Sequence, residues 1–343
     1  MKKIIKQTVI LGMLILVNNI SFGQISQGGT PYSFKSRLKS TADKDTITLS
    51  KEISSIEMPK IRKQVIDSIK QKNLLFEEHQ FAYGFNVNID VKTSSTIDSL
   101  DVGLLHRLSI KSDGAKSINL IFKKYILPKG AKLFIYSKNH ESIIGAFTSN
   151  NNKQSKRLPT LPVYGEEIIV EYFEPYFTDF KGQLIIGEVN HDFIGVVSIE
   201  GKIEDDFGSS GNCQVDINCS EGNNWQTEKR AVCRIVKNGK THCSGALLNN
   251  TNYDGTPYFL TANHCISTQS EADDCICIFN YESPSCGGGD GSTSQSIAAG
   301  TLRATRRESD FTLLEFSHSP LSSWNPYYAG WDNRNITKNN VVG

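Results

Sequence analysis

The sequence predicts an all-β protein built in two parts. In the first part apolar residues recur at every second position after residue 81, which is the period of a half-buried strand. The clearest run consists of Phe85, Val87, Ile89 and Val91. Turn residues such as Asp113-Gly114 and Pro128-Lys129-Gly130 flank the next run. The eight cysteines all lie after residue 212, and this abrupt onset marks the second part.

The composition describes a globular chain with balanced charge. Its 343 residues include 37 Lys plus Arg and 36 Asp plus Glu, for a net charge of +1. Such a balance gives no electrostatic reason to expect nucleic acid or an anionic membrane as a partner. Nothing in these totals predicts an oligomeric state.

The first 23 residues resemble an export signal. Lys2, Lys3 and Lys6 form a basic start, residues 8–17 form an uncharged apolar run, and Ser21-Phe22-Gly23 offers small residues for cleavage. The run is about half the ~20 residues that a membrane-spanning helix needs. We therefore predict a signal peptide over residues 1–23, a protein secreted to the extracellular space or periplasm, and no membrane association after cleavage.

Residues 24–207 contain no cysteine and are predicted to form a β-rich region. A short helix is predicted from Pro59, because Ile61, Val65 and Ile69 repeat at four-residue spacing. Several short strands with turns between them favour an antiparallel β-sandwich; they are predicted at residues 85–91, 118–122, 133–136, 168–172 and 184–189. We expect four scattered histidines to be surface residues: His79, His106, His140 and His191. The region suits a pro-region, and it suits an adhesive or carbohydrate-binding module equally well.

Residues 208–343 hold the cysteines, which in an exported chain indicate disulfides. Zinc is the rival explanation, but Cys275-Ile276-Cys277 has one intervening residue and no second hairpin follows it. We therefore expect neither a metal nor another cofactor. The acidic and Gly/Ser-rich stretch at residues 204–211 resembles a linker or a site of proteolytic cutting.

Two segments of the second part contain candidate catalytic residues. Phe259-Leu260 predicts a buried strand, and His264 follows it at the turn Thr-Ala-Asn-His-Cys. Asp310 directly precedes a second apolar strand, Phe311-Thr-Leu-Leu-Glu. A histidine held rigidly can take the proton of an attacking serine, and a carboxylate aimed at it fixes its tautomer.

Together these segments resemble the lysyl endopeptidases, a bacterial branch of the chymotrypsin-like (trypsin-like) serine proteases. The resemblance rests on several separated motifs in order: Gly211-Asn-Cys-Gln-Val-Asp216, Cys219-Ser-Glu-Gly-Asn-Asn-Trp-Gln226, Cys243-Ser-Gly-Ala-Leu247, Phe259-Leu-Thr-Ala-Asn-His-Cys265, Ser309-Asp-Phe-Thr-Leu-Leu-Glu315 and Tyr328-Ala-Gly-Trp-Asp332. It implies a double β-barrel of which this chain supplies the first barrel and little of the second.

The resemblance also implies roles for individual residues. His264 would be the general base and then the general acid, and Asp310 would orient it. Two disulfides are implied, Cys243 with Cys265 and Cys219 with Cys286, while Cys213 would pair with a cysteine far downstream that these 343 residues do not contain. Pairing of Cys233 with Cys275 or Cys277 stays open. Substrates would be proteins or peptides, cut by preference after lysine.

The serine nucleophile is missing from the expected place. No Gly-x-Ser-Gly motif follows Asp310, and Gly208-Ser-Ser-Gly211 precedes both partners. Ser319, Ser322 and Ser323 lack the neighbouring glycines that form an oxyanion hole. We therefore expect a protease precursor truncated before its nucleophile and inactive as written. The alternative is a secreted, non-catalytic binding protein with a degenerate protease domain.

Overall fold

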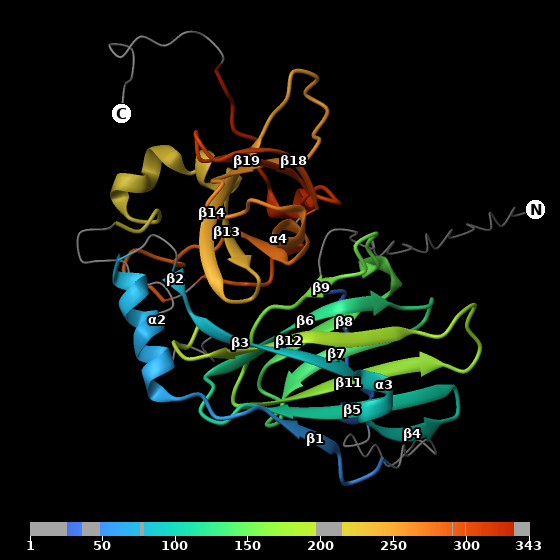
Figure 1. Ribbon diagram of the computed structural model, residues 1–343. Coiled ribbons are helices and arrows are strands. Elements are labelled where there is room, and N and C mark those ends of the chain that lie inside the picture. The colour runs from blue at the N-terminus through green and yellow to red at the C-terminus, as the bar shows by residue number, and fades with distance from the viewer. Residues whose placement is uncertain are drawn as a thin grey trace, which may run out of the picture.

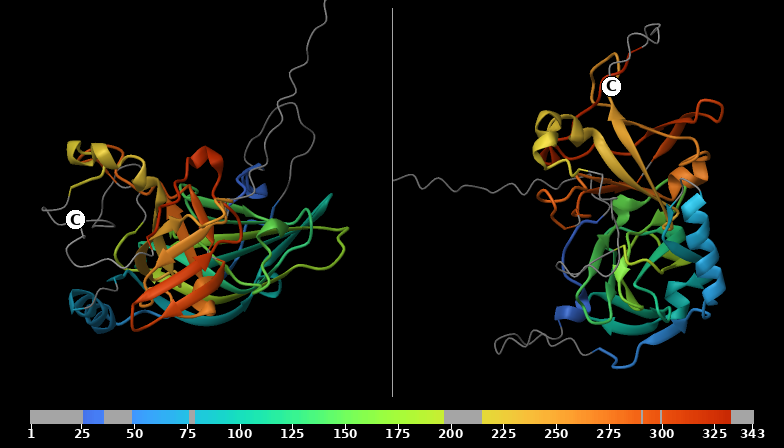
Figure 2. Two further views of the ribbon diagram at one scale, coloured as in Figure 1. Left: turned by 90° about the horizontal axis from the view of Figure 1, so that it is seen from above. Right: turned by 90° about the vertical axis from the view of Figure 1, so that its left-hand side faces the viewer.

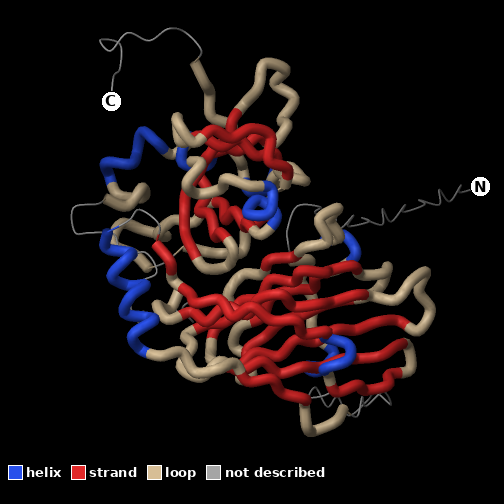
Figure 3. The backbone as a smooth tube through the Cα atoms, viewed as in Figure 1, coloured by secondary structure: helices blue, strands red, loops and turns tan. Residues whose placement is uncertain are grey.

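The computed structural model describes residues 26–35, 49–75, 79–196, 215–289, 291–298 and 300–332, and strands dominate them (Figures 1 and 3). The predicted all-β class is confirmed. The predicted signal peptide, the boundary at residue 207 and Cys213 lie outside the described residues. The α-helices of the described residues are α1 (Tyr32–Lys35), α2 (Lys63–Leu75), α3 (Val91–Ser94) and α4 (Gln269–Asp273).

Residues 54–192 form two sheets packed face to face. One sheet has the order β1-β5-β11-β7-β8, with β4 added beside β5, and the other has the order β10-β6-β12-β3, with β9 beside β6. Their strands are β1 (Ser54–Glu57), β3 (Ala82–Asp90), β4 (Thr96–Leu100), β5 (Gly103–Lys111), β6 (Ser117–Ile126), β7 (Lys132–Ser137), β8 (Ile143–Phe147), β9 (Leu158–Pro159), β10 (Val163–Tyr164), β11 (Glu167–Pro175) and β12 (Gln183–Asp192). The core between the sheets includes Leu108, Phe122 and Val170, all fully buried.

Two predicted boundaries in this region differ from the structure. The strand predicted to reach Val91 ends at Asp90, whose carboxylate accepts hydrogen bonds from the backbone of Lys92 and Thr93 and so caps α3. Helix α2 begins at Lys63 rather than near Pro59. The first difference arises from this cap, which hydrophobic spacing does not register.

Two of the four histidines expected at the surface are buried, so that prediction is wrong for them. His106 is 3% exposed and its Nδ1 lies 3.0 Å from the Ser95 hydroxyl, whereas His191 is 4% exposed and its Nδ1 lies 2.8 Å from the Ser112 hydroxyl. Burial lowers the pKa of both imidazoles, because the charged form loses solvation. They are therefore neutral core residues that each satisfy a buried hydroxyl.

Residues 232–315 form one curled sheet with the order β17-β16-β13-β14-β15-β19-β18. We call this sheet the barrel sheet; it lies above the sandwich in Figure 1. Its strands are β13 (Val232–Lys237), β14 (Thr241–Leu248), β15 (Tyr258–Thr261), β16 (Cys275–Phe279), β17 (Ser296–Ala298), β18 (Thr301–Arg306) and β19 (Phe311–Glu315). Phe259, Phe279 and Leu314 fill its interior.

The sandwich and the barrel sheet are packed against each other, as the two views of Figure 2 also show. Val236, Ile276 and Ile278 of the barrel sheet belong to the same buried apolar cluster as the sandwich core. Arg157 holds Asp274 with two hydrogen bonds, and Lys240 lies 2.6 Å from Glu188. The short strand β2 (His79–Gln80) pairs with β14 across the same boundary.

Candidate active site

The turn that carries His264 is anchored on all sides. It follows β15, which lies between β14 and β19 and buries Phe259 completely. The hydroxyl of Thr261 donates to the carbonyl of Ser244 at 2.8 Å, and the Cys243–Cys265 disulfide joins the turn to β14. His264 is therefore fixed in position at the rim of the barrel sheet.

Close approach of β14 to β15 depends on Gly245. A Cβ added at this position would lie 2.5 Å from the carbonyl oxygen of Leu260 and would collide with the Phe259 ring. The glycine in the motif Cys-Ser-Gly-Ala-Leu is thus required by strand packing. It brings Ser244 within reach of Thr261 and so supports the histidine turn.

Asp310 lies directly before β19 and faces His264. The strands β15 and β19 pair with Thr261 opposite Thr312, so the residues that follow one strand and precede the other meet at the same edge. Asp310 has a φ of 45°, a left-handed conformation that aspartate tolerates better than most residues. This conformation turns the carboxylate out of the strand direction.

Both carboxylate oxygens of Asp310 bind His264. The backbone N–H of His264 donates to Oδ1 at 2.9 Å, and Nδ1 lies 2.7 Å from Oδ2. These hydrogen bonds, the backbone one foremost, lower the pKa of the Asp310 carboxyl and keep it ionised at neutral pH. An ionised carboxylate accepts only, so Nδ1 carries the proton and Nε2 presents its lone pair.

Two residues that the sequence analysis did not identify stabilise the contact between His264 and Asp310. Thr312 is fully buried and its hydroxyl donates to the carbonyl of Ile266 at 2.6 Å, which ties β19 to the end of the histidine turn. Asn263 donates to the Thr305 hydroxyl at 2.7 Å. The signal in the sequence was a threonine inside the apolar run Phe-Thr-Leu-Leu, where a buried hydroxyl requires a partner.

The cysteines divide into bonded and free ones. Disulfides join Cys243 to Cys265 and Cys219 to Cys286, the two pairs that the resemblance implied. Cys233, Cys275 and Cys277 are buried thiols, and burial raises the pKa of Cys233. Ligand atoms of Cys243, His264 and Cys265 lie within 4.8 Å of one another, but both sulfurs are in a disulfide and offer no thiolate to a metal.

His264 borders a groove of about 860 Å³. Its lining includes two residues with large exposed apolar surfaces, Trp225 at 59% and Val232 at 51%. The guanidinium of Arg234 stacks over the Tyr281 ring at 4.7 Å in the same groove. Ser319, Ser322 and Ser323 are not among the lining residues. The groove can hold an extended chain beside the imidazole.

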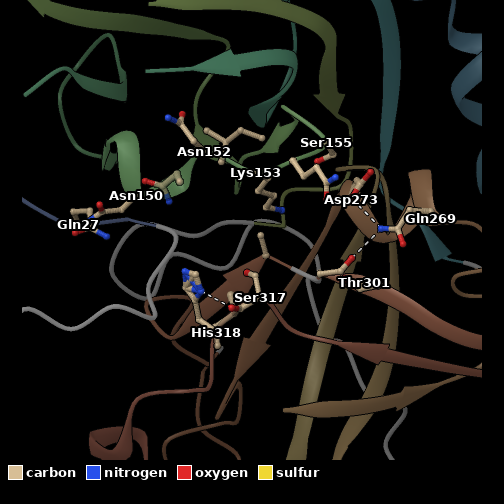
Figure 4. Close-up of a pocket in the computed structure, with 16 residues that line it drawn as sticks. Gln27, Asn150, Asn152, Lys153, Ser155, Gln269, Asp273, Thr301, Ser317 and His318 are labelled. Carbon is tan, nitrogen blue, oxygen red and sulfur yellow. Dashed lines mark hydrogen bonds between the residues drawn. The ribbon is translucent and has the colours of Figure 1, made fainter. Parts of the chain in front are cut away.

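A second cavity, of about 640 Å³, lies between the sandwich and the barrel sheet (Figure 4). Amide side chains dominate its lining, and Gln269 bridges Asp273 and the carbonyl of Gly300. Its histidine, His318, has Nδ1 2.6 Å from the carbonyl of Ser317, and among the described residues no hydrogen bond joins it to a carboxylate. This cavity offers no pair of groups for acid–base chemistry comparable to His264 and Asp310.

The curled sheet with a histidine–aspartate pair at its rim is the arrangement of a chymotrypsin-like fold. Residues 207–343 match the family model of the lysyl endopeptidase C-terminal domain. The chain is also 25% identical over 261 residues to a lysyl endopeptidase of Pseudomonas aeruginosa. That alignment covers 71% of this chain and 55% of the relative, so the chain spans about half the relative's length. The second part of the chain is thus similar to the C-terminal domain of lysyl endopeptidases, as its motifs predicted.

Among the described residues, none of the helices combines the length and the apolar character needed to cross a membrane.

Proposed function

We propose that the chain is the leading part of a secreted serine endopeptidase precursor. The observation that carries the proposal is the doubly hydrogen-bonded pair of His264 and Asp310 beside the groove. The lysyl endopeptidase relative supports protein substrates and cleavage after lysine. Residues 24–207 serve as a pro-region, and the signal at residues 1–23 directs export.

In this mechanism His264 accepts and then donates a proton in each of two successive steps. Its Nε2 accepts the proton of a serine hydroxyl as the oxygen forms a bond to the peptide carbonyl carbon. The imidazolium then gives that proton to the leaving amine as the C–N bond breaks, and an acyl-enzyme remains. In the second step water attacks the acyl carbon while His264 takes its proton. His264 returns that proton to the serine oxygen as the ester bond breaks, and the carboxylic acid is released. Asp310 stays ionised throughout and stabilises the imidazolium.

The nucleophilic serine is expected outside the 343 residues, in a Gly-rich turn that also supplies the oxyanion hole. No Gly-x-Ser-Gly motif lies between Asp310 and Gly343. The residue that selects a lysine side chain is expected in the same second barrel. His264 and Asp310 are thus the part of the proton-transfer machinery that this chain contributes.

Cleavage of a denatured protein tests the proposal. The protein purified from its natural source should cut reduced, carboxymethylated lysozyme after lysine, as shown by mass spectrometry of the products. A fluorophosphonate probe should label one of its serines. The His264→Ala variant should lose both reactions, because the serine keeps its proton. Cleavage that persists in His264→Ala, or labelling of no serine, would contradict the proposal.

A further inference from the structure

Arg234 projects from the outer face of the barrel sheet into the groove beside His264. Its two neighbours in β13, Cys233 and Ile235, are buried and belong to the apolar interior of the barrel sheet. Because side chains alternate along a strand, Arg234 lies on the opposite face, where it lines the groove together with His264. The groove therefore has a catalytic candidate at one position and a guanidinium at another.

The strand register gives the spacing between Arg234 and the histidine turn. Arg234 pairs with Ser244 of β14, and the carbonyl of Ser244 accepts from the hydroxyl of Thr261 at the end of β15. Two strand spacings thus separate Arg234 from the start of the turn that carries His264, which is about 10 Å. An extended polypeptide advances about 3.3 Å per residue, so this spacing corresponds to two or three residues.

The guanidinium of Arg234 is held flat against an aromatic ring. Its central carbon lies 4.7 Å from the centroid of the Tyr281 ring, which lines the same groove. Stacking fixes the plane of the guanidinium and leaves its N–H donors at the edge of that plane. A planar guanidinium in a fixed orientation matches the two oxygens of a carboxylate.

The half of the substrate that follows the cleaved bond is the half that passes over this groove. In the proposed function the nucleophilic serine and the residue that selects lysine lie in the second barrel, so the acyl half is held there. His264 gives its proton to the leaving amine, and the leaving half therefore begins at the imidazole. The groove continues from the imidazole toward Arg234.

We propose that Arg234 selects substrates with an acidic side chain at the second or third residue after the cleaved bond. This inference rests on the proposed function and deepens it, because it names a substrate feature besides the lysine. The carboxylate accepts two hydrogen bonds from the edge of the guanidinium. Hydrogen bonds to charged groups are strong enough to favour such a substrate about tenfold in kcat/KM.

Cleavage of matched peptides by the protein purified from its natural source tests the inference. Each internally quenched peptide contains one lysine, with aspartate or asparagine at one of the three positions before or after it. We expect kcat/KM to be about tenfold higher for aspartate than for asparagine at the second or third position after the lysine. Before the lysine the two residues should give equal values, which controls for long-range attraction.

Variants of the groove assign the preference to Arg234. Arg234→Gln should remove it and leave cleavage of the asparagine peptides unchanged. Arg234→Glu should reverse it, so that arginine is favoured over aspartate at the same position, and a purely structural role would not produce this reversal. The matched control Lys229→Gln should keep the preference, because Lys229 already binds Glu282 at 2.8 Å and Asn218 at 2.9 Å.

The outcomes separate this inference from the proposed function. Cleavage without any preference overturns the inference while the proposed function stands. The same holds for a preference that Arg234→Gln and Arg234→Glu leave intact, and for one that lies before the lysine. If no peptide is cleaved, the proposed function fails and this inference fails with it.

Discussion

Replacing Asp310 with asparagine in the protein purified from its natural source is expected to lower kcat by about 10⁴-fold on a lysine-containing peptide substrate. The asparagine amide can donate to Nδ1, which favours the tautomer with its proton on Nε2, and that tautomer cannot accept the serine proton. Steady-state kinetics with a fluorogenic lysyl peptide measures the effect. KM should change little, because Asp310 contacts His264 and not the substrate groove.

The matched control is Glu308→Gln, which removes an exposed carboxylate two residues away. Glu308 pairs with Arg306 at the surface and has no contact with His264 among its described interactions. It should retain full activity, because exposed ion pairs contribute little. If Asp310→Asn were as active as Glu308→Gln, the role assigned to Asp310 would be wrong.

In the protein purified from its natural source, removing the Cys243–Cys265 disulfide is expected to lower the free energy of unfolding by about 3 kcal/mol and to abolish peptide hydrolysis. The two cysteines are 22 residues apart, and a cross-link of that span restricts the unfolded chain by roughly this free energy. The double variant Cys243→Ala/Cys265→Ala also frees the histidine turn from β14. Urea denaturation measures the stability, and hydrolysis of the lysyl peptide measures the activity.

The control for this prediction is the second disulfide. Cys219 and Cys286 are 67 residues apart, and the pair does not include the histidine turn. Cys219→Ala/Cys286→Ala should therefore lose comparable stability but keep activity at temperatures where it remains folded. Equal activity of the two double variants would show that Cys243–Cys265 does not position His264.

The sequence alone placed each residue of the candidate pair at a strand end. Phe259-Leu260 and Phe311–Glu315 are apolar runs of strand length, and both become paired strands. Which residues meet across two strands depends on their register, which a single sequence does not specify. The contact of His264 with Asp310 therefore came from the family resemblance, and the structure supplies its geometry.

The interface between sandwich and barrel sheet could not be predicted. The strands Val232–Lys237 and Cys275–Phe279 carry apolar residues on both faces, which fits a barrel interior as well as a contact with another sheet. Their outer residues Val236, Ile276 and Ile278 join the sandwich core. The burial of His106 and His191 could not be predicted either. A single polar residue in a strand does not indicate whether a buried hydroxyl group lies beside it.

The most direct test of the central claim is the protonation of His264 observed by ¹⁵N NMR of the 343-residue chain. The structure predicts that neutral His264 carries its proton on Nδ1, strongly deshielded by the 2.7 Å hydrogen bond to Asp310, while Nε2 is bare. Asp310→Asn should shift the proton to Nε2. A wild-type His264 with its proton on Nε2, or one that is unaffected by Asp310→Asn, would contradict the assignment of this pair as the base and its orienting carboxylate.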